Sequence, residues 1–285
     1  MREWVYFKLY PGGFERLDVA LPVVDDVVAG LADRLERWFF IRYVDESGPH
    51  LRLRLLPQDG AVGTVHDRAF AAMSAWLGRS DAPTWRTAWL GVTQSHHPYS
   101  STTKALEPTV YEPEWTKYGG AVGVALAEEL FLRSSRFALR ATNLGRRPGR
   151  SRAAIAFGLM RDVLPAGLAP LAATFWSQYA DFWMRGVSHD HLTPAAVSAG
   201  SDPGALAASM ATLEEAVFAE DDGLTEVCAG YVQAVHRYLD DAARVTSRPA
   251  HALLFHQVHM TNNRLGVTPV EESVLARALH EEVAA

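Results

Sequence analysis

The sequence predicts an α+β protein in which a strand-rich first half packs against a helical second half. Segments with the two-residue alternation of strands gather before residue 120. After the double glycine at 119–120, most segments carry apolar residues at the spacing of helices. We therefore expect one domain over residues 1–285, with a mainly antiparallel sheet in about 1–120 and helices in about 121–285.

The first half alternates strands with helices. "EWVYFKLY" (3–10) alternates and ends at "PGG", which predicts a first strand. "VVDDVVAGLADRLERW" (23–38) has helical spacing. "WFFIRYVD" (38–45) and "HLRLRLL" (50–56) are predicted to form a hairpin, because "ESGP" between them favours a turn. A helix over 64–78, an extended segment over 82–94 and a polar loop over 95–108 are expected next.

The second half is predicted to be mainly helical. Thr193 followed by Pro194 predicts a capped helix start, and "GRRPGRSR" (145–152) is the best candidate boundary in the chain. Pro249 early and Gly266 at the end fit the last helix that we predict. The expected helices are 121–142, 151–164, 171–186, 204–218, 225–245 and 249–266.

Composition excludes several classes of protein. The net charge of −6 and pI near 6.0 argue against bulk binding of nucleic acid. The single cysteine, Cys228, permits neither an intrachain disulfide nor a thiolate metal cluster, and it is expected to be a small core residue. We find no signal peptide and no uninterrupted apolar run of membrane length, so we expect a soluble cytoplasmic protein.

A cationic row on the predicted hairpin is the first candidate site. In "HLRLR", alternation places His50, Arg52 and Arg54 on one face of a strand. The leucines between them face the other side. Two arginines two residues apart can grip carboxylate or phosphate oxygens. A solvated sheet face is the alternative, and the histidine could also be a turn residue.

The segment "YEPEWTKYGG" is the second candidate. It combines Glu114 and Lys117 with the aromatic residues Tyr111 and Tyr118. A lysine near arginines can keep its charge or, when desolvated, act as a base. The alternative is a surface loop in which the two glycines allow a tight turn into the next helix.

The segment "FHQVHMTNNRLG" is the third candidate. His259 and Asn263, four residues apart, share a helical face, and histidine is the usual proton-transfer group near neutral pH. His256 would add a second imidazole, but no third metal ligand is evident, so we predict no metal. The alternative is a helix end at which the histidines and Arg264 complement the helix dipole.

These three segments, in this order, resemble the C-terminal domain of class I lanthipeptide dehydratases. That domain also occurs alone in thiopeptide-type biosynthesis proteins, and the absence of the larger glutamylation domain suggests a stand-alone member. The resemblance extends from Trp38 to Gly266, and "EWVYFKLY" is similar to the way such domains open.

The resemblance implies an enzyme that matures a ribosomally made peptide. Such domains eliminate glutamate from glutamylated Ser or Thr and leave dehydroalanine or dehydrobutyrine. A base removes the Cα proton, and cations neutralise the leaving carboxylate and the developing enolate. The expected catalytic residues are Arg52, Arg54, Glu114, Lys117 and His259, and the expected substrate-binding residues are His50, Tyr111, Tyr118, Asn263 and Arg264.

The resemblance also implies partners. We expect a precursor peptide with leader and core, a separate glutamyl-tRNA-dependent glutamylation enzyme, no cofactor, and no direct contact with nucleic acid or membrane; a homodimer stays open. In the family, Lys117 is often arginine. Lysine keeps the charge but loses the bidentate fork.

Two other functions stay open. Pyridine synthases of the same fold join two dehydroalanines by a formal aza-cycloaddition, aromatise the ring and expel the leader peptide. "YEPE", in place of an arginine-bearing "YxRE", puts the chain on the thiopeptide side, whereas the retained arginines, Lys117, Glu114 and His259 favour elimination. A non-catalytic module that binds the leader peptide is the third reading.

Overall fold

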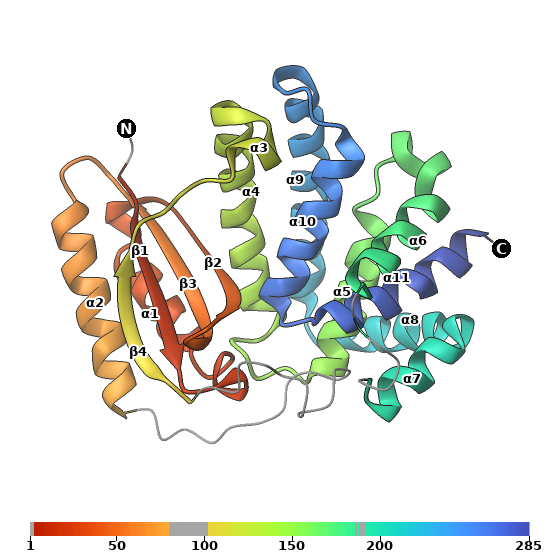
Figure 1. Ribbon diagram of the computed structural model, residues 1–285, viewed down its shortest axis with the longest axis horizontal. Helices are drawn as coiled ribbons and strands as arrows, with labels where there is room; N and C mark the ends of the chain where they lie inside the picture. The colour runs from red at the N-terminus through yellow and green to blue at the C-terminus, as the bar shows by residue number, and fades with distance from the viewer. Residues whose placement is uncertain (1–2, 80–101, 186, 188–191, 285) are drawn as a thin grey trace. The chain divides into compact units, whose positions relative to one another are not determined.

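The computed structural model describes residues 3–79, 102–185, 187 and 192–284. These residues form two compact units, coloured from red to yellow-green and from green to blue in Figure 1. The sheet unit holds described residues up to Arg146, and the helical unit holds those from Arg147 onward. The division falls within "GRRPGRSR".

The sheet unit is built on four antiparallel strands. They are β1 (Val5–Pro11), β2 (Leu35–Asp45), β3 (Gly48–Pro57) and β4 (Lys104–Thr109), in the spatial order β2-β3-β1-β4. The predicted hairpin is confirmed, because β2 and β3 pair from Asp45 and Gly48 inward. Gly48 has φ 119°, a left-handed conformation that side chains disfavour.

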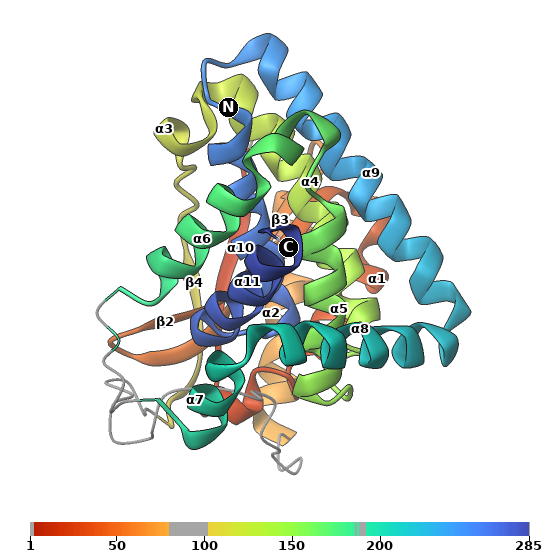
Figure 2. The same cartoon turned by 90° about the vertical axis from the view of Figure 1, so that its right-hand side faces the viewer.

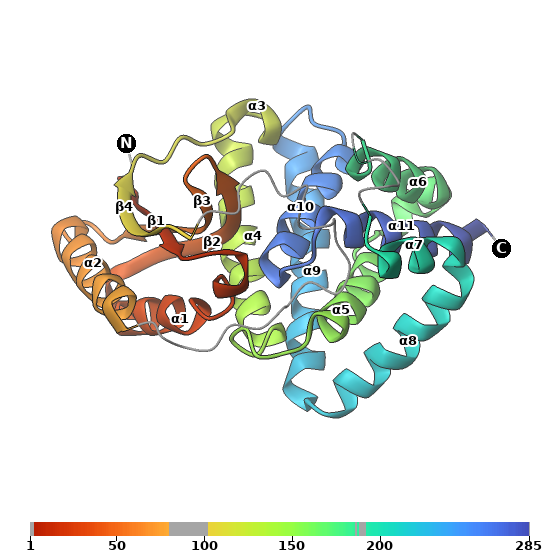
Figure 3. The same ribbon diagram turned by 60° about the horizontal axis from the view of Figure 1, so that its bottom comes forward.

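One face of this sheet is core. Leu51, Leu53 and Leu55 are completely buried, which stabilises the fold by about 1.5–3 kcal/mol for each side chain. Helices α1 (Leu21–Gly30) and α2 (Val62–Arg79) contact each other, and Figure 3 shows them on one side of the sheet. Phe7 on this face contacts the rings of His66 and Phe70 of α2. The opposite face carries the cationic row.

Two sequence predictions in this unit are wrong. The helix predicted over 23–38 ends at Gly30, and after a 3-10 turn (Ala32–Arg34) the chain enters β2 at Leu35. Pairing with β3 outweighs the helical spacing there. The loop predicted over 95–108 contains β4, an edge strand that pairs with β1 despite Pro108. Residues 82–94 and 95–101 lie outside the described residues.

Helix α4 (Gly120–Ala141) packs along β2. The backbone N–H of Phe40 donates to Ser135 Oγ at 3.2 Å, and the rings of Phe39 and Phe131 lie 5.2 Å apart. A single helical turn, α3 (Trp115–Tyr118), precedes α4. Gly119 and Gly120 both have positive φ, at 84° and 90°, so the double glycine forms the tight turn between the two helices.

The helical unit consists of α5 (Gly149–Asp162), α6 (Ala172–Trp183), α7 (Pro194–Ser201), α8 (Pro203–Ala219), α9 (Asp222–Val245), α10 (Ala250–Leu265) and α11 (Pro269–Ala284). Helix α11, which the sequence analysis did not single out, packs against α5, α6 and α8 (Figure 2). Thr193 caps α7 as predicted, and Gly266 ends α10 with φ 80°.

Several predicted features can be placed directly. Cys228 is buried, and burial raises its thiol pKa to about 12, as expected for a core residue. Arg152 is buried too, and it donates to the carbonyls of Arg147 and Leu265. In the described part of the chain, no single helix is long and apolar enough to cross a membrane, although the bent pair of Gly149–Asp162 and Ala166–Trp183 meets the length and composition test jointly.

Candidate functional site

Arg52 and Arg54 lie on the face of the sheet opposite the buried leucines, and both are partly exposed. The guanidinium carbon of Arg52 lies 3.3 Å from the centre of the Tyr43 ring. That of Arg54 lies 4.8 Å from the ring centres of Tyr6 and Tyr111. Arginine packs well against such rings, so the aromatic groups hold both guanidinium groups in place.

Neither of these two arginines has a carboxylate partner within the residues that the structure describes. Other arginines of the unit do: Arg42 donates to Asp18 at 2.6 Å, and Arg37 lies 3.4 Å from Glu128. Burial lowers the pKa of Arg54, yet a guanidinium stays protonated in proteins. Within the described residues, the face therefore presents two guanidinium groups that no carboxylate pairs with, as an anion-binding site requires.

His50 is not a third cation. It is completely buried, and burial lowers its pKa, although a hydrogen bond to the Gly48 carbonyl opposes this effect. Its Nδ1 lies 3.0 Å from that carbonyl, and its Nε2 accepts from Arg52 Nε at 3.2 Å. The structure thus corrects the predicted row of three charges to two arginines and one neutral imidazole. Its burial also leaves no exposed surface for a substrate.

A hydrogen-bonded network of Asp45, Lys8 and Tyr10 adjoins His50. Asp45 accepts hydrogen bonds from Lys8 at 2.9 Å and from Tyr10 at 3.0 and 3.2 Å. Burial opposes ionisation of Asp45, but these bonds outweigh it and lower its pKa. The bond to Asp45 raises the pKa of Lys8. Lys8 stands directly opposite Arg52 across the strands, and the carboxylate offsets the repulsion between them.

Lys117 and Glu114 bind each other. Lys117 Nζ lies 3.1 and 3.3 Å from the two carboxylate oxygens of Glu114, which is exposed. Tyr111 is partly buried beside Arg54, whereas Tyr118 is buried against the ring of Phe131. Tyr111 is therefore placed with the arginines, and Tyr118 contributes to packing.

In the helical unit, His259 is held by a buried carboxylate. Its Nδ1 lies 2.9 Å from Glu272 Oε1, and its ring stacks on Trp183 at 3.9 Å. Glu272 is completely buried and also accepts hydrogen bonds from Tyr179 and from Asn262. Since an ionised carboxylate can only accept, Nδ1 carries the hydrogen of this bond, and Nε2 is the ring nitrogen that Glu272 leaves unused. The ring remains partly exposed.

The two remaining predicted residues follow His259 on α10. Asn263 is partly buried. Arg264 is completely buried and donates to the Met260 carbonyl at 2.8 Å. This contact fits the alternative that the arginine completes the helix end.

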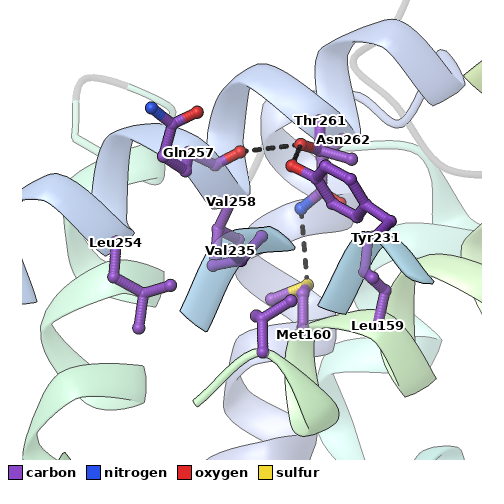
Figure 4. A pocket seen from close by; sticks show the side chains of 10 residues that line it. Leu159, Met160, Tyr231, Val235, Leu254, Gln257, Val258, Thr261 and Asn262 are labelled. Carbon is purple, nitrogen blue, oxygen red and sulfur yellow. Dashed lines mark hydrogen bonds between the residues drawn. The ribbon is translucent and has the colours of Figure 1, made fainter. Parts of the chain in front are cut away.

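Two cavities are lined by none of the candidate site residues, although Asn262, which donates to Glu272, lines the first of them. One, shown in Figure 4, lies between α5, α9 and α10 and is lined partly by Asn262, Thr261 and Tyr231. It offers about 10 Å³, which is about enough for one water molecule. The other, near Arg136 and Trp38, adjoins α1 and α4. Neither is lined by Arg52, Arg54 or His259, so neither is the predicted site.

Comparison with known families decides the relationship. The family described as "Lantibiotic biosynthesis dehydratase C-term" matches residues 4–283. This chain belongs to that family. The family's description places it among proteins of lantibiotic-type peptide biosynthesis, in agreement with the resemblance seen in the sequence. No curated protein matches.

Solved structures share the fold of this lantibiotic-dehydratase family member. The tRNA-dependent lantibiotic dehydratase MibB from Microbispora sp. 107891 is 22% identical, with a TM-score of 0.67 over 97% of this chain. The chain spans only 27% of MibB. The pyridine synthase TbtD from thiomuracin biosynthesis is 17% identical, with a TM-score of 0.66 over 99% of this chain and 98% of TbtD. TsrL is 16% identical, with a TM-score of 0.58.

Sequence reasoning missed several residues of this family member that support the candidate groups. Glu272 is the most important, and a signal for it exists: it precedes Leu275 and Leu279 at helical spacing, so it occupies the apolar stripe of α11. Asp45 and Tyr10 gave no comparable signal. Their roles depend on cross-strand neighbours that only the register supplies.

Proposed function

We propose that this protein eliminates glutamate from glutamylated Ser or Thr residues of a precursor peptide. The observation that carries the proposal is the pair Arg52 and Arg54, which lack a carboxylate partner among the described residues and rest on aromatic rings. A glutamyl ester supplies what such a pair binds: a free carboxylate, and a second carboxylate that forms as the ester departs.

The chemical step requires one base. In the proposed reaction, His259 Nε2 takes the proton from Cα of the modified residue. The electron pair of the C–H bond becomes the Cα–Cβ double bond, and the Cβ–O bond breaks to release glutamate. The bond from Nδ1 to Glu272 supports this role, because the buried carboxylate stabilises the imidazolium that forms. The arginines and His259 lie in different units, and we propose and test each role by itself.

Formation of a pyridine ring is the second candidate. One observation favours it: the chain and TbtD cover each other almost end to end, at 99% and 98%. In that reaction two dehydroalanines join, the ring becomes aromatic and the leader is expelled. The unneutralised arginines would then have no glutamate to bind, so we place this function second. A module that only binds the leader peptide would need neither the arginine pair nor the His259–Glu272 pair.

One comparison of substrates separates these functions. The protein is incubated with a peptide that carries a glutamyl ester on serine, and separately with a dehydrated, azole-bearing peptide. Mass spectrometry of the first should show loss of glutamate and a dehydroalanine. Pyridine formation with leader release from the second, and no glutamate loss from the first, would overturn the proposal in favour of the cyclase. Binding without any product would favour the module.

Two further experiments test whether the predicted cationic residues bind the free carboxylate of the glutamyl ester. A serine butyryl ester lacks the free carboxylate, so it should react more slowly than the glutamyl ester if the arginines bind that group. The double variant Arg54→Ala with Lys117→Ala should lose most elimination. Arg133→Ala is the matched control, because this arginine is exposed and already paired with Glu129. Elimination at the parental rate by the double variant would refute the assignment of these residues.

A further inference from the structure

His50 occupies a position from which it cannot touch a substrate. Its side chain is completely buried in β3, with its ring 4.5 Å from the ring of Tyr10 and 5.7 Å from that of Tyr43. Of the two arginines, Arg52 is the one that His50 contacts among the described residues, through the hydrogen bond to Nε2. A role in the reaction would therefore be indirect, and Arg52 is the candidate substrate-binding residue to which the ring is hydrogen-bonded.

The two hydrogen-bond partners of the His50 ring determine which ring nitrogen carries the proton. The Gly48 carbonyl, 3.0 Å from Nδ1, can only accept a hydrogen bond, so Nδ1 carries the hydrogen. Arg52 Nε, 3.2 Å from Nε2, can only donate, so Nε2 must present a lone pair. Both contacts are satisfied only by the neutral imidazole with its proton on Nδ1. A protonated ring would set one N–H against another.

The charges around the ring suit this neutral form. Asp45 Oδ1 lies 3.8 Å from Nδ1, but its charge is shared with Lys8 and Tyr10, which donate to it. Arg52 itself faces Nε2, and Lys8 is the second cation near the ring. Burial lowers the pKa of His50 from the ordinary 6.5, and the two cations act in the same direction.

We propose that His50 is a positioning residue for Arg52: its Nε2 binds Arg52 Nε and leaves both terminal amino groups for the substrate. The expected effect on catalysis rests on the proposed function, whereas the geometry of the His50–Arg52 contact does not depend on it. With Nε occupied and the guanidinium plane lying on Tyr43, Arg52 can grip a carboxylate only end-on, through its two terminal nitrogens. A side-on grip, which uses Nε, is excluded.

Two substitutions and a double-mutant cycle test the kinetic effect. His50→Leu removes the acceptor, and we expect it to raise KM for a glutamylated peptide about tenfold with a smaller change in kcat, as expected for a lost hydrogen bond to a charged group. His50→Gln offers an amide oxygen to Arg52 and should stay within about threefold of the parent. In an Arg52→Ala background, His50→Leu should add no further effect. An equal effect in both backgrounds would show a purely structural role and overturn the inference.

The pH profile gives an independent readout. Protonation of His50 sets a second N–H against Arg52, and because burial lowers the pKa of His50 from the ordinary 6.5, KM of the parent should rise only at a pH below that ordinary value. His50→Gln cannot titrate, so it should lack this rise. The same acidic rise in both proteins would contradict the inference.

Nitrogen NMR of histidine-labelled protein tests the geometry without any reaction. We expect His50, assigned by its loss in His50→Gln, to show a protonated Nδ1 and an unprotonated, hydrogen-bonded Nε2 at neutral pH. The Arg52 Nε–H should exchange slowly in the parent and rapidly in His50→Leu. A protonated Nε2 would overturn the inference whether or not the protein eliminates glutamate. If this signature is found but Arg52→Ala eliminates normally, the proposed function fails while the positioning geometry stands.

Discussion

Substitution of Glu272 gives the sharpest test of the proposal that His259 is the catalytic base. Glu272→Gln keeps the size of this buried side chain but removes its charge. Glu272 now accepts hydrogen bonds through both oxygens, from His259 on one and from Tyr179 and Asn262 on the other. Glutamine has one acceptor oxygen and one amino group. If the oxygen serves Tyr179, the amino group faces His259 and favours the tautomer with the proton on Nε2.

The magnitude follows from the contact that is lost. A hydrogen bond to a charged group contributes about 1.5–3 kcal/mol, and 1.36 kcal/mol is tenfold in rate, so kcat should fall by about 10- to 150-fold. The wrong tautomer could extend the loss toward about 10⁴-fold, as in serine proteases. KM should change little, because Glu272 is completely buried and cannot touch the substrate.

The assay is steady-state loss of glutamate from a glutamylated peptide, with kcat and KM determined separately. Glu271→Gln is the matched control, since Glu271 is also buried but accepts from the Thr268 backbone N–H at 2.7 Å, a capping contact that glutamine can keep. Circular dichroism should show both variants folded. If Glu272→Gln matches the control, or raises KM while kcat is unchanged, the carboxylate does not support a base.

Three further predictions address charge, burial and backbone. Arg54→Lys keeps the charge but loses the planar fork, so KM for the glutamylated peptide should rise about tenfold; an unchanged KM would argue against bidentate binding. Because the pKa of Cys228 is raised from 9.0 to about 12, its thiolate fraction at pH 8 falls about a thousandfold. Iodoacetamide should accordingly label unfolded protein far faster than native protein, by mass spectrometry. Gly145→Ala should lower the free energy of unfolding in urea by about 3 kcal/mol or more, since its Cβ would lie 2.3 Å from the Asp18 carbonyl oxygen. Gly60→Ala, with positive φ but open space, should cost only about 1–2 kcal/mol, and equal losses would contradict the clash.

Much of the fold could be predicted because its elements are locally consistent. The β2–β3 hairpin has a clear alternation and a Ser-Gly-Pro turn, and α4 begins at the double glycine. Elements defined by their partners were missed. Strand β4 has no apolar alternation, and its existence depends on pairing with β1. The start of β2 has helical spacing at Leu35, and the strand pairing overrides it.

The candidate site residues likewise divide into those that a local sequence pattern could predict and those that depend on neighbours elsewhere in the chain. Alternation correctly placed Arg52 and Arg54 on one face of β3 with leucines behind them. It could not assign a charge to His50, because the protonation of that ring is set by a carbonyl two residues away and by the arginine beside it. Partners distant in sequence, such as Tyr43 and Tyr111 beneath the arginines, required the strand register and the chain after β4.

Lysine at position 117, where the family often has arginine, has a limited physical consequence. Its charge is paired with Glu114, but this pair is exposed, and exposed ion pairs contribute only about 0–1 kcal/mol. An incoming anion could therefore take the lysine from Glu114 at little cost. Arginine at this position would have offered two parallel hydrogen bonds, whereas lysine offers a single charged point. The substitution thus changes the geometry of an anion contact more than its charge. The elimination hypothesis depends chiefly on Arg52 and Arg54, whose guanidinium groups lie against aromatic rings.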